Sequence, residues 1–271
     1  MNIRKKINRA FELCEKFFSL NWFNPFATLY LNLRCLPLGD ALRFPVWVFG
    51  RPRLMNLCGR IEIKGQLRSG IVRFNRLQVG SPSNAGIQSE LNVAGTIIFH
   101  GDANIQTGCR IVVDGGAVLE IGKGFSMMDC VILGCAKSIK MGDYVRITHR
   151  SQIFDTNFHY IVNYNTGDIP PCSRPVEIGD HCWICNTSTV APGAVIPSTT
   201  IVASNSLVNK DFSSIPPNSI IGGMPARLIC SGYRRVLNIK KEREITRYYE
   251  SHLDAMVKVP DCLDPAQWFE I

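Results

Sequence analysis

The stretch QIFDTNFHYI, residues 152–161, places His159 among polar and aromatic residues, with Asp155 and Asn157 shortly before it. An imidazole, whose ordinary pKa is about 6.5, can take a proton from a hydroxyl group as that group attacks an acyl carbon. A carboxylate, an amide or a backbone carbonyl can hold such a ring in one orientation. We therefore take His159 as the candidate general base, with Asp155 and Asn157 as the candidate orienting residues. The alternative is a histidine that only makes hydrogen bonds within its own loop.

The other histidines have weaker support from their surroundings. His149, in the unit ITHRSQ, is the second candidate for a base. His181, in IGDHCW, is expected at a corner facing solvent, and neither His100 nor His252 has a supporting context. No second cysteine pair at zinc spacing accompanies Cys182 and Cys185, so this C-x-x-C predicts packing residues and no metal site.

A strict period of six residues follows this stretch. Aliphatic residues recur six apart, and a small residue follows each of the first five by four positions; the two series are Ile178, Ile184, Val190, Ile196, Val202 and Val208, and Cys182, Ser188, Ala194, Thr200 and Ser206. A helix would need apolar residues every three or four positions, and a half-buried strand would need them at every second one. Period six instead predicts short strands joined by tight corners. Three strands would form one coil, and stacked coils would bury the aliphatic residues as a column.

The same period runs upstream with extra residues at some corners. It appears at Phe99, Ile105 and Ile111, at Ile121, Met127 and Leu133, and at Met141, Ile147 and Ile153. Glycines follow the inward residue at Gly122, Gly134, Gly142 and Gly179, where a corner needs an unhindered backbone. The gap between Ile153 and Ile178 predicts a loop over 154–175 that leaves the stack. Loops of this length in a compact repeat fold are usually functional.

Composition divides the 271 residues into a central repeat and two ends. We expect an extension over 1–58, basic and then aromatic-rich, a β-helix domain over 59–229, and a basic helix with a tail over 230–271. The aromatic-rich part contains no uninterrupted apolar run of about 18–20 residues, so a membrane-spanning helix is not expected. The aromatic segment would cap the core or pack on a subunit, with a membrane surface as the alternative. The C-terminal helix could cover the last coil or lean on the donor site.

Charge and cysteine usage suggest the partners and the compartment. The eleven cysteines are scattered without a secretory signal, which favours a reducing cytoplasm. The formal net charge is +8, and runs of Lys and Arg lie near the two ends, which favours an anionic partner, such as a phosphate cofactor or a membrane surface. No aromatic and basic platform accompanies these charges, so nucleic acid is not expected.

The stretch from Ile178 to Ile229, with its elements HCWICN and GGMPAR, resembles the hexapeptide-repeat acyltransferases, as does DTNFH at 155–159. The resemblance extends over about residues 97–229. The nearest resemblance is to the sugar and polysaccharide O-acetyltransferases. It implies a left-handed parallel β-helix, a homotrimer with active sites between neighbouring subunits, and a histidine base at the protruding loop. Many polysaccharide members carry D-x-D-x-H here, whereas this chain has Asn157 in place of the second aspartate.

The resemblance also implies where acetyl-CoA, the acyl donor, would bind. Lys210 with Asn209 and Arg227 in the GGMPAR element would meet the CoA phosphates, and Ala203 and Ser204 would form a narrow wall beside its arm. Trp183 matches a tryptophan of the family, and Asn186 stands where some relatives have a serine near the thioester. Corner glycines of the family are absent at Cys185, Ala191, Pro197 and Ala203.

The function expected from these residues is transfer of an acetyl group to a sugar hydroxyl of a cell-surface polysaccharide or its precursor, without an acyl-enzyme and without a metal. One alternative is an acetyltransferase whose acceptor is an amino sugar or another small molecule. A β-helix carbonic anhydrase would need three converging histidines, and His149, His159 and His181 lack its close H-x₄-H spacing. The remaining alternative is a non-catalytic scaffold, which would not bind CoA.

Overall fold

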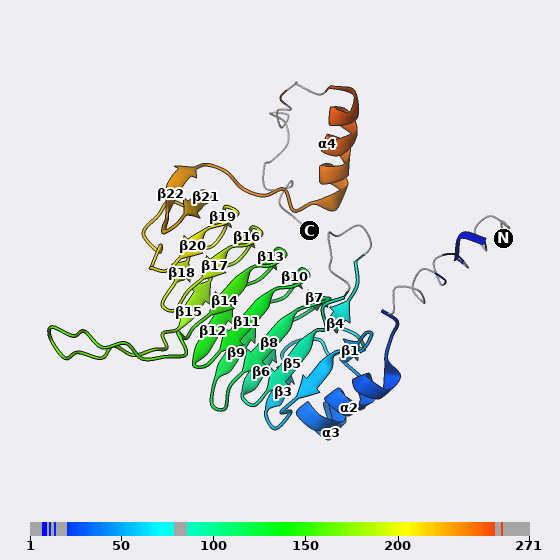
Figure 1. Ribbon diagram of the computed structural model, residues 1–271. Coiled ribbons are helices and arrows are strands. Elements are labelled where there is room, and N and C mark those ends of the chain that lie inside the picture. The colour runs from blue at the N-terminus through cyan, green and yellow to red at the C-terminus, as the bar shows by residue number, and fades with distance from the viewer. Residues whose placement is uncertain are drawn as a thin grey trace.

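The computed structural model describes residues 7–9, 11, 14, 21–78, 86–252 and 256, and these form an elongated coil of short strands, with two short helices at its N-terminal end and one helix beside it (Figure 1). The chain passes from one sheet to the next in a fixed order and returns to the first sheet one coil further along. Every strand pair is parallel except the last hairpin. This is the predicted mainly β fold, a left-handed parallel β-helix.

Three sheets form the sides of the coil. The first contains β1 (Val46–Val48), β4 (Val72–Arg76), β7 (Ala103–Gln106), β10 (Phe125–Met127), β13 (Arg146–Ile147), β16 (Trp183–Ile184), β19 (Ile201–Val202), β21 (Ser219–Gly223) and β22 (Ala226–Ser231). The second contains β2 (Arg53–Met55), β5 (Glu90–Val93), β8 (Arg110–Val113), β11 (Ile132–Cys135), β14 (Gln152–Phe154), β17 (Thr189–Val190) and β20 (Leu207–Val208). The third contains β3 (Arg60–Ile63), β6 (Thr96–Phe99), β9 (Val118–Ile121), β12 (Ser138–Met141), β15 (Val176–Ile178) and β18 (Val195–Ile196).

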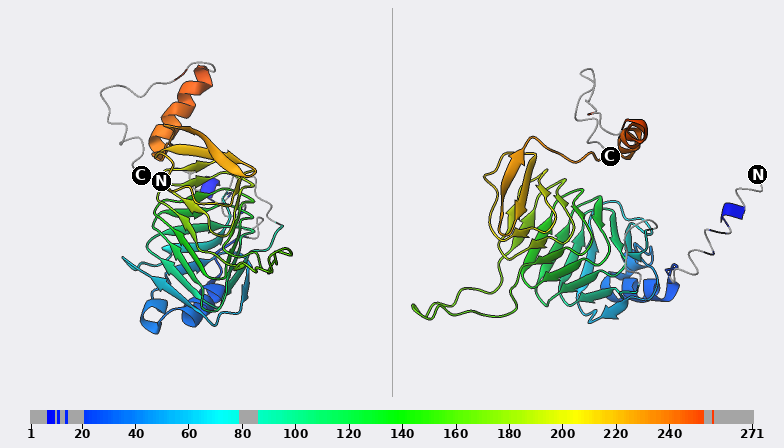
Figure 2. Two further views of the ribbon diagram at one scale, coloured as in Figure 1. Left: turned by 90° about the vertical axis from the view of Figure 1, so that its left-hand side faces the viewer. Right: turned by 45° about the horizontal axis from the view of Figure 1, so that its top comes forward.

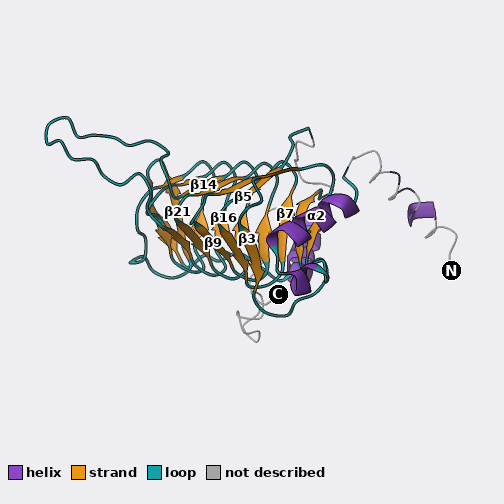
Figure 3. Cartoon of the chain, turned by 90° about the horizontal axis from the view of Figure 1, so that it is seen from below, coloured by secondary structure: helices purple, strands orange, loops and turns teal. Residues whose placement is uncertain are grey.

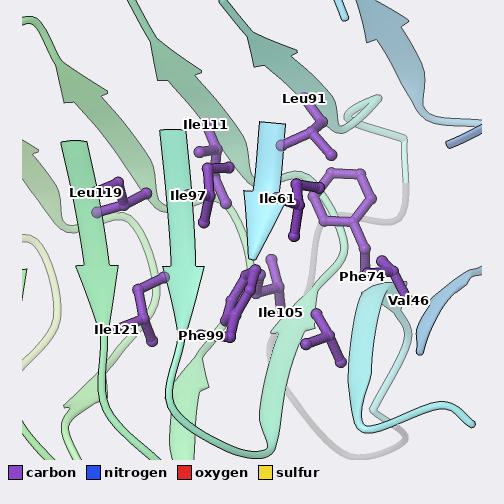
Figure 4. A pocket seen from close by; sticks show the side chains of 11 residues that line it. Val46, Ile61, Phe74, Leu91, Ile97, Phe99, Ile105, Ile111, Leu119 and Ile121 are labelled. Atoms are coloured by element: carbon purple, nitrogen blue, oxygen red, sulfur yellow. The ribbon is translucent and has the colours of Figure 1, made fainter. Parts of the chain in front are cut away.

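The six-residue period is confirmed as the inward face of these strands. Every aliphatic residue of the series from Ile178 to Val208 is at most 3% exposed, and the small residues four positions later are buried as well. The column continues to the first coils, where Ile61, Phe74, Leu91 and Ile105 meet in the interior (Figure 4). Burial of one or two apolar side chains per strand, repeated along the coil, is the main stabilising contribution of the fold.

Glycines stack where the third sheet turns into the first. A Cβ atom on Gly142 would lie 2.2 Å from an Asp180 side-chain oxygen, and one on Gly122 would lie 2.3 Å from the Gly142 backbone. Successive coils approach too closely here for any side chain, as the sequence predicted for these corners.

The aromatic N-terminal segment caps the first coil. Helix α2 (Pro25–Cys35) begins at the N-cap Asn24 and is followed by α3 (Leu38–Ala41). Asn32 on α2 both donates to and accepts from the backbone of Val46, which ties the helix to β1. The predicted cap is confirmed, but β1 and β2 already pair with β4 and β5, so the coil begins within the expected extension 1–58. Residues 1–6 of that extension lie outside the described residues.

At the other end the last coil is covered by the antiparallel hairpin of β21 and β22, and not by the C-terminal helix. The chain then runs back along the first sheet in an extended segment, residues 232–238, before α4 (Ile239–Ser251) begins at the N-cap Asn238 (Figure 2). The helix is therefore shorter than the expected one, and the tail from 257 lies outside the described residues. Among the helices of the described part, none has the length and apolar character to cross a membrane.

Candidate active site

The loop that carries His159 leaves the coil between the second and the third sheet. It extends from the end of β14 to the start of β15 and projects away from the coil (Figures 1 and 3). Its two arms are joined at the root, where the Asn157 amide donates to the Cys172 carbonyl and the Arg174 amide donates to the Asp155 carbonyl, both at 2.8 Å. The loop predicted from the break in the period is therefore present, with a paired and fixed root.

Asp155 has a different role from the predicted one. Its fully buried carboxylate accepts hydrogen bonds from the backbone amides of Ala136, Lys137 and Ser138 at 2.6–2.7 Å, in the corner of the preceding coil. Three amide donors use both carboxylate oxygens, and no hydrogen bond joins Asp155 to His159 within the described residues. Asp155 thus anchors the loop root to the coil, and the prediction that it orients His159 is corrected.

His159 lies four residues beyond this anchor and is exposed to solvent. Asn157 is exposed too, and its backbone amide donates to the Cys172 carbonyl at the loop root. The preceding Phe158 packs edge-on against Phe154, with ring centroids 5.5 Å apart, which holds the start of the loop against the second sheet. The imidazole is therefore exposed on a loop whose start is held against the coil.

The remaining histidines occupy other environments. The His181 ring stacks on Tyr144 at 5.1 Å, and burial holds its pKa below the ordinary value, so the expectation that it faces solvent is corrected. His100 pairs with Glu120 at 2.7 Å, and His252 stacks on Tyr248 at 4.3 Å. In the part of the chain that the structure describes, no three His, Cys, Asp or Glu side chains gather as metal ligands.

A hollow lies on the second sheet directly below the loop. It is lined by aliphatic and aromatic side chains with one cation and one carboxylate at its rim, including Val112, Ile132, Phe154, Phe158, Arg110 and Asp114. Gly134 forms part of its floor, where a Cβ atom would lie 2.8 Å from the Phe154 ring. An apolar floor with few polar groups is typical of a site for a small molecule.

Three of the predicted donor-site residues gather where the first sheet turns into the second. The Ser204 hydroxyl donates to the Asn186 side chain at 2.6 Å, and Ala203 lies in the same corner. Arg227, which is exposed, pairs across the terminal hairpin with Gly222, and Gly222 packs on Ala203. This edge of the coil thus has small residues and an exposed cation, Arg227.

Asn209 and Lys210 lie on another edge, where the second sheet turns into the third. The Lys210 ammonium sits over the Phe212 ring, 5.0 Å from its centroid. The corner of Lys210 is thus on the same edge as the loop of His159, two coils further on. The predicted donor residues are therefore divided between both ends of the second-sheet strands.

Trp183 lies on the outer face of the first sheet, under the extended segment 232–238. The Arg235 guanidinium sits over its ring at 5.0 Å, and Arg146 is its neighbour on β13. Burial holds the pKa of Arg146 and of Arg235 below the ordinary value. Arg146 lowers the pKa of Arg235 further, and Glu242 on α4 partly offsets the shift of both. Sequence reasoning missed Arg146 and Arg235, because no periodic signal brings residue 235 back to strand β16.

Bacterial O-acetyltransferases are among the sequence relatives of this chain. No protein-family model matches the chain. A stretch of 143 residues, 50% of the chain, is 29% identical to WbbJ of Escherichia coli K12, which is assigned to lipopolysaccharide biosynthesis as an O-acetyl transferase, and covers 71% of that protein. A stretch of 116 residues, 42% of the chain, is 28% identical to the galactoside O-acetyltransferase of the same organism and covers 54% of it.

Among solved structures, the polysialic acid O-acetyltransferase OatWY is 18% identical, with a TM-score of 0.46 over 70% of this chain and 99% of that one. The D94A mutant of AntD, an N-acyltransferase from Bacillus cereus in complex with dTDP and coenzyme A, is also 18% identical, with a TM-score of 0.43 over 69% of this chain and 91% of that one. The homologues of this chain by sequence are thus sugar and polysaccharide O-acetyltransferases of the hexapeptide-repeat family.

Proposed function

We propose that this protein transfers an acetyl group from acetyl-CoA to a hydroxyl group of a cell-surface polysaccharide or its precursor. The observation that carries this proposal is the anchored loop, in which exposed His159 directly follows Phe158, a residue that lines the apolar hollow on the coil. The activities named for the homologous proteins support the acyl transfer, and the loop residues would line the acceptor site.

His159 acts as the general base in this proposal. As the acceptor oxygen attacks the thioester carbon, its proton moves to the imidazole, and a tetrahedral intermediate forms that needs hydrogen-bond donors for its oxyanion. The carbon–sulfur bond then breaks, and the imidazolium returns the proton to the departing CoA sulfur. The acetyl group passes directly to the acceptor, so no nucleophilic side chain of the protein is acylated.

The donor and the base require a second copy of the chain. The small residues and Arg227 lie at the start of the second-sheet strands, whereas the His159 loop leaves from their ends. In an assembly, the edge with Arg227 of one copy could lie against the edge with the His159 loop of a neighbouring copy. We therefore propose a homotrimer in which each active site lies between two subunits, as the resemblance implies, working in the cytoplasm.

The donor would lie along the edge formed by Asn186, Ala203 and Ser204. The residues present suit a CoA arm, because small side chains leave backbone groups accessible and exposed Arg227 can meet a phosphate in bidentate fashion. Lys210 would reach the donor from the neighbouring subunit.

Calorimetric titration of acetyl-CoA into the intact protein tests this proposal without knowledge of the acceptor. We expect binding in the micromolar to submillimolar range, weakened about tenfold or more in Arg227→Ala, since a charge-assisted phosphate contact is lost. The matched control is Arg60→Ala on β3, whose guanidinium already pairs with Glu62. No binding to the intact protein would contradict acyl transfer and favour a scaffold. Acetylation of an amino group in preference to a hydroxyl would identify the alternative acceptor class.

A further inference from the structure

The cap helix α2 has an apolar outer face in addition to the face that packs on the coil. One face packs on the first coil and buries Thr28, Leu31, Asn32 and Cys35. The opposite face exposes large hydrophobic side chains at helical spacing, namely Phe26 (83% exposed), Leu29 (44%), Tyr30 (53%) and Leu33 (47%). A helix that covers a core normally turns a polar face to water. Hydration of this outer face is therefore unfavourable, and the surface is suited to a partner.

The exposed apolar surface continues on both sides of α2. Phe23 precedes the helix and is 43% exposed, while Leu38 and Leu42, at and after α3, are 67% and 62% exposed. We call these seven residues the cap patch: Phe23, Phe26, Leu29, Tyr30, Leu33, Leu38 and Leu42. Scattered exposed hydrophobic residues are ordinary, but a cluster of this size on one small cap marks an interaction surface.

The net charge of the protein is concentrated in the same part of the chain. Residues 1–78 contain fourteen Lys and Arg against four Asp and Glu, a formal charge of +10, whereas residues 79–271 sum to −2. Within 21–78 the acidic residues are Asp40 and Glu62, and Glu62 already pairs with Arg60 and Lys64. Arg34 at the end of α2 and Arg43 just after α3 are exposed beside the cap patch. The partner of this cap is therefore expected to be anionic as well as apolar.

We propose that the cap patch docks the protein onto the surface of an anionic lipid bilayer. The aliphatic and aromatic side chains would enter the boundary between headgroups and acyl chains, and the arginines would meet the phosphates. A bilayer has an apolar interior and, where its lipids are anionic, a negatively charged surface. Helix α2 lies at the outer end of the coil, far from the loop that carries His159 (Figure 3). With 11 residues α2 is too short to span, so the contact is peripheral. This inference does not rest on the proposed acyl transfer.

Flotation of the full chain with lipid vesicles tests the proposal without any substrate. We expect binding to phosphatidylcholine vesicles that contain phosphatidylglycerol, weaker binding to pure phosphatidylcholine, and loss of the difference at high salt. The double variant Phe26→Gln with Tyr30→Gln should lower the partition coefficient about tenfold or more, because two inserted aromatic side chains are removed. The matched control is Tyr164→Gln, since Tyr164 is 96% exposed in the distant loop.

A charge-reversal pair separates the electrostatic contribution. Arg34→Glu with Arg43→Glu should lower binding to the anionic vesicles more than to neutral ones, whereas Lys140→Glu, at the exposed position of β12, should leave both unchanged. Failure of the intact chain to float with anionic vesicles would overturn the proposal, as would equal binding by the Phe26 and Tyr30 variant. If the intact chain does not bind vesicles and the molar mass in solution falls in the Phe26 and Tyr30 variant, the patch would instead be assigned to contacts between copies of the chain.

Discussion

The Asp155 carboxylate accepts a hydrogen bond of 2.6 Å from the backbone amide of Ser138, one coil below in the stack. With the amides of Ala136 and Lys137, this contact fixes the point where the chain leaves the coil. A buried carboxylate therefore holds the root of the loop that carries His159. Asp155 is a positioning residue, and its effects on stability and on rate should appear together.

Substitution Asp155→Asn should lower the free energy of unfolding by about 2–3 kcal/mol. The amide nitrogen would face at least one backbone donor, which leaves buried polar groups unsatisfied. Denaturant unfolding measures the change, and Asp168→Asn in the exposed part of the same loop is the control. A variant that retains the full stability but loses activity would contradict the anchoring role and restore a direct catalytic one.

Substitution Gly142→Ala should destabilise the protein by about 1–3 kcal/mol, as expected for overpacking against a neighbour that cannot withdraw. The added Cβ atom would lie 2.7 Å from the Asp180 amide of the next coil as well as close to its side chain. Gly115→Ala serves as the control, because a Cβ atom there would meet nothing within 4 Å. Thermal unfolding of the two variants gives the comparison, and equal melting temperatures would contradict the tight stacking of the corners.

Substitution Arg235→Gln should loosen the segment 232–238 from the first sheet. The cation over the Trp183 ring contributes about 0.5–2 kcal/mol in a partly desolvated site. Tryptophan emission should shift to longer wavelength and become more accessible to acrylamide, whereas Arg243→Gln on the exposed side of α4 should change neither. Unaltered emission would show that the segment stays in place without this contact.

The Cys172 thiol at the loop root should be alkylated at lower pH than an ordinary thiol. A hydrogen bond from Ser173, and then one from Tyr160, hold the pKa of Cys172 below its usual value, so more thiolate is present near neutrality. By contrast, burial raises the pKa of Cys185 to about 11. Iodoacetamide labelling of Cys172, followed by mass spectrometry across a pH series, should move to higher pH in Ser173→Ala. An identical pH profile in that variant would refute the assignment.

The coil itself was predictable because one residue in six is constrained by the interior. The aliphatic series from Ile178 to Val208 and the corner glycines report contacts between coils that repeat regularly along the sequence. The loop was predictable for the same reason, since Ile153 and Ile178 break the period.

Contacts that do not repeat could not be predicted in this way. The Asp155 carboxylate was assigned to His159, four residues away, because the amides of residues 136–138 are near it only after the coils have stacked. Similarly, the packing of Arg235 on Trp183 depends on the direction in which the chain leaves β22, for which the sequence has no periodic signal. The first coil was missed because β1 and β2 are embedded in an aromatic segment whose pattern is dominated by the cap.

The most direct test of the account is acceptor-dependent release of CoA from acetyl-CoA, measured by mass spectrometry with the intact protein and with His159→Gln. Loss of a general base should lower the turnover rate by about 10²–10⁴-fold. The melting temperature and acetyl-CoA affinity should stay unchanged, because the His159 side chain is exposed. Turnover of His159→Gln within a few-fold of the intact protein would contradict the assignment of His159 as the base.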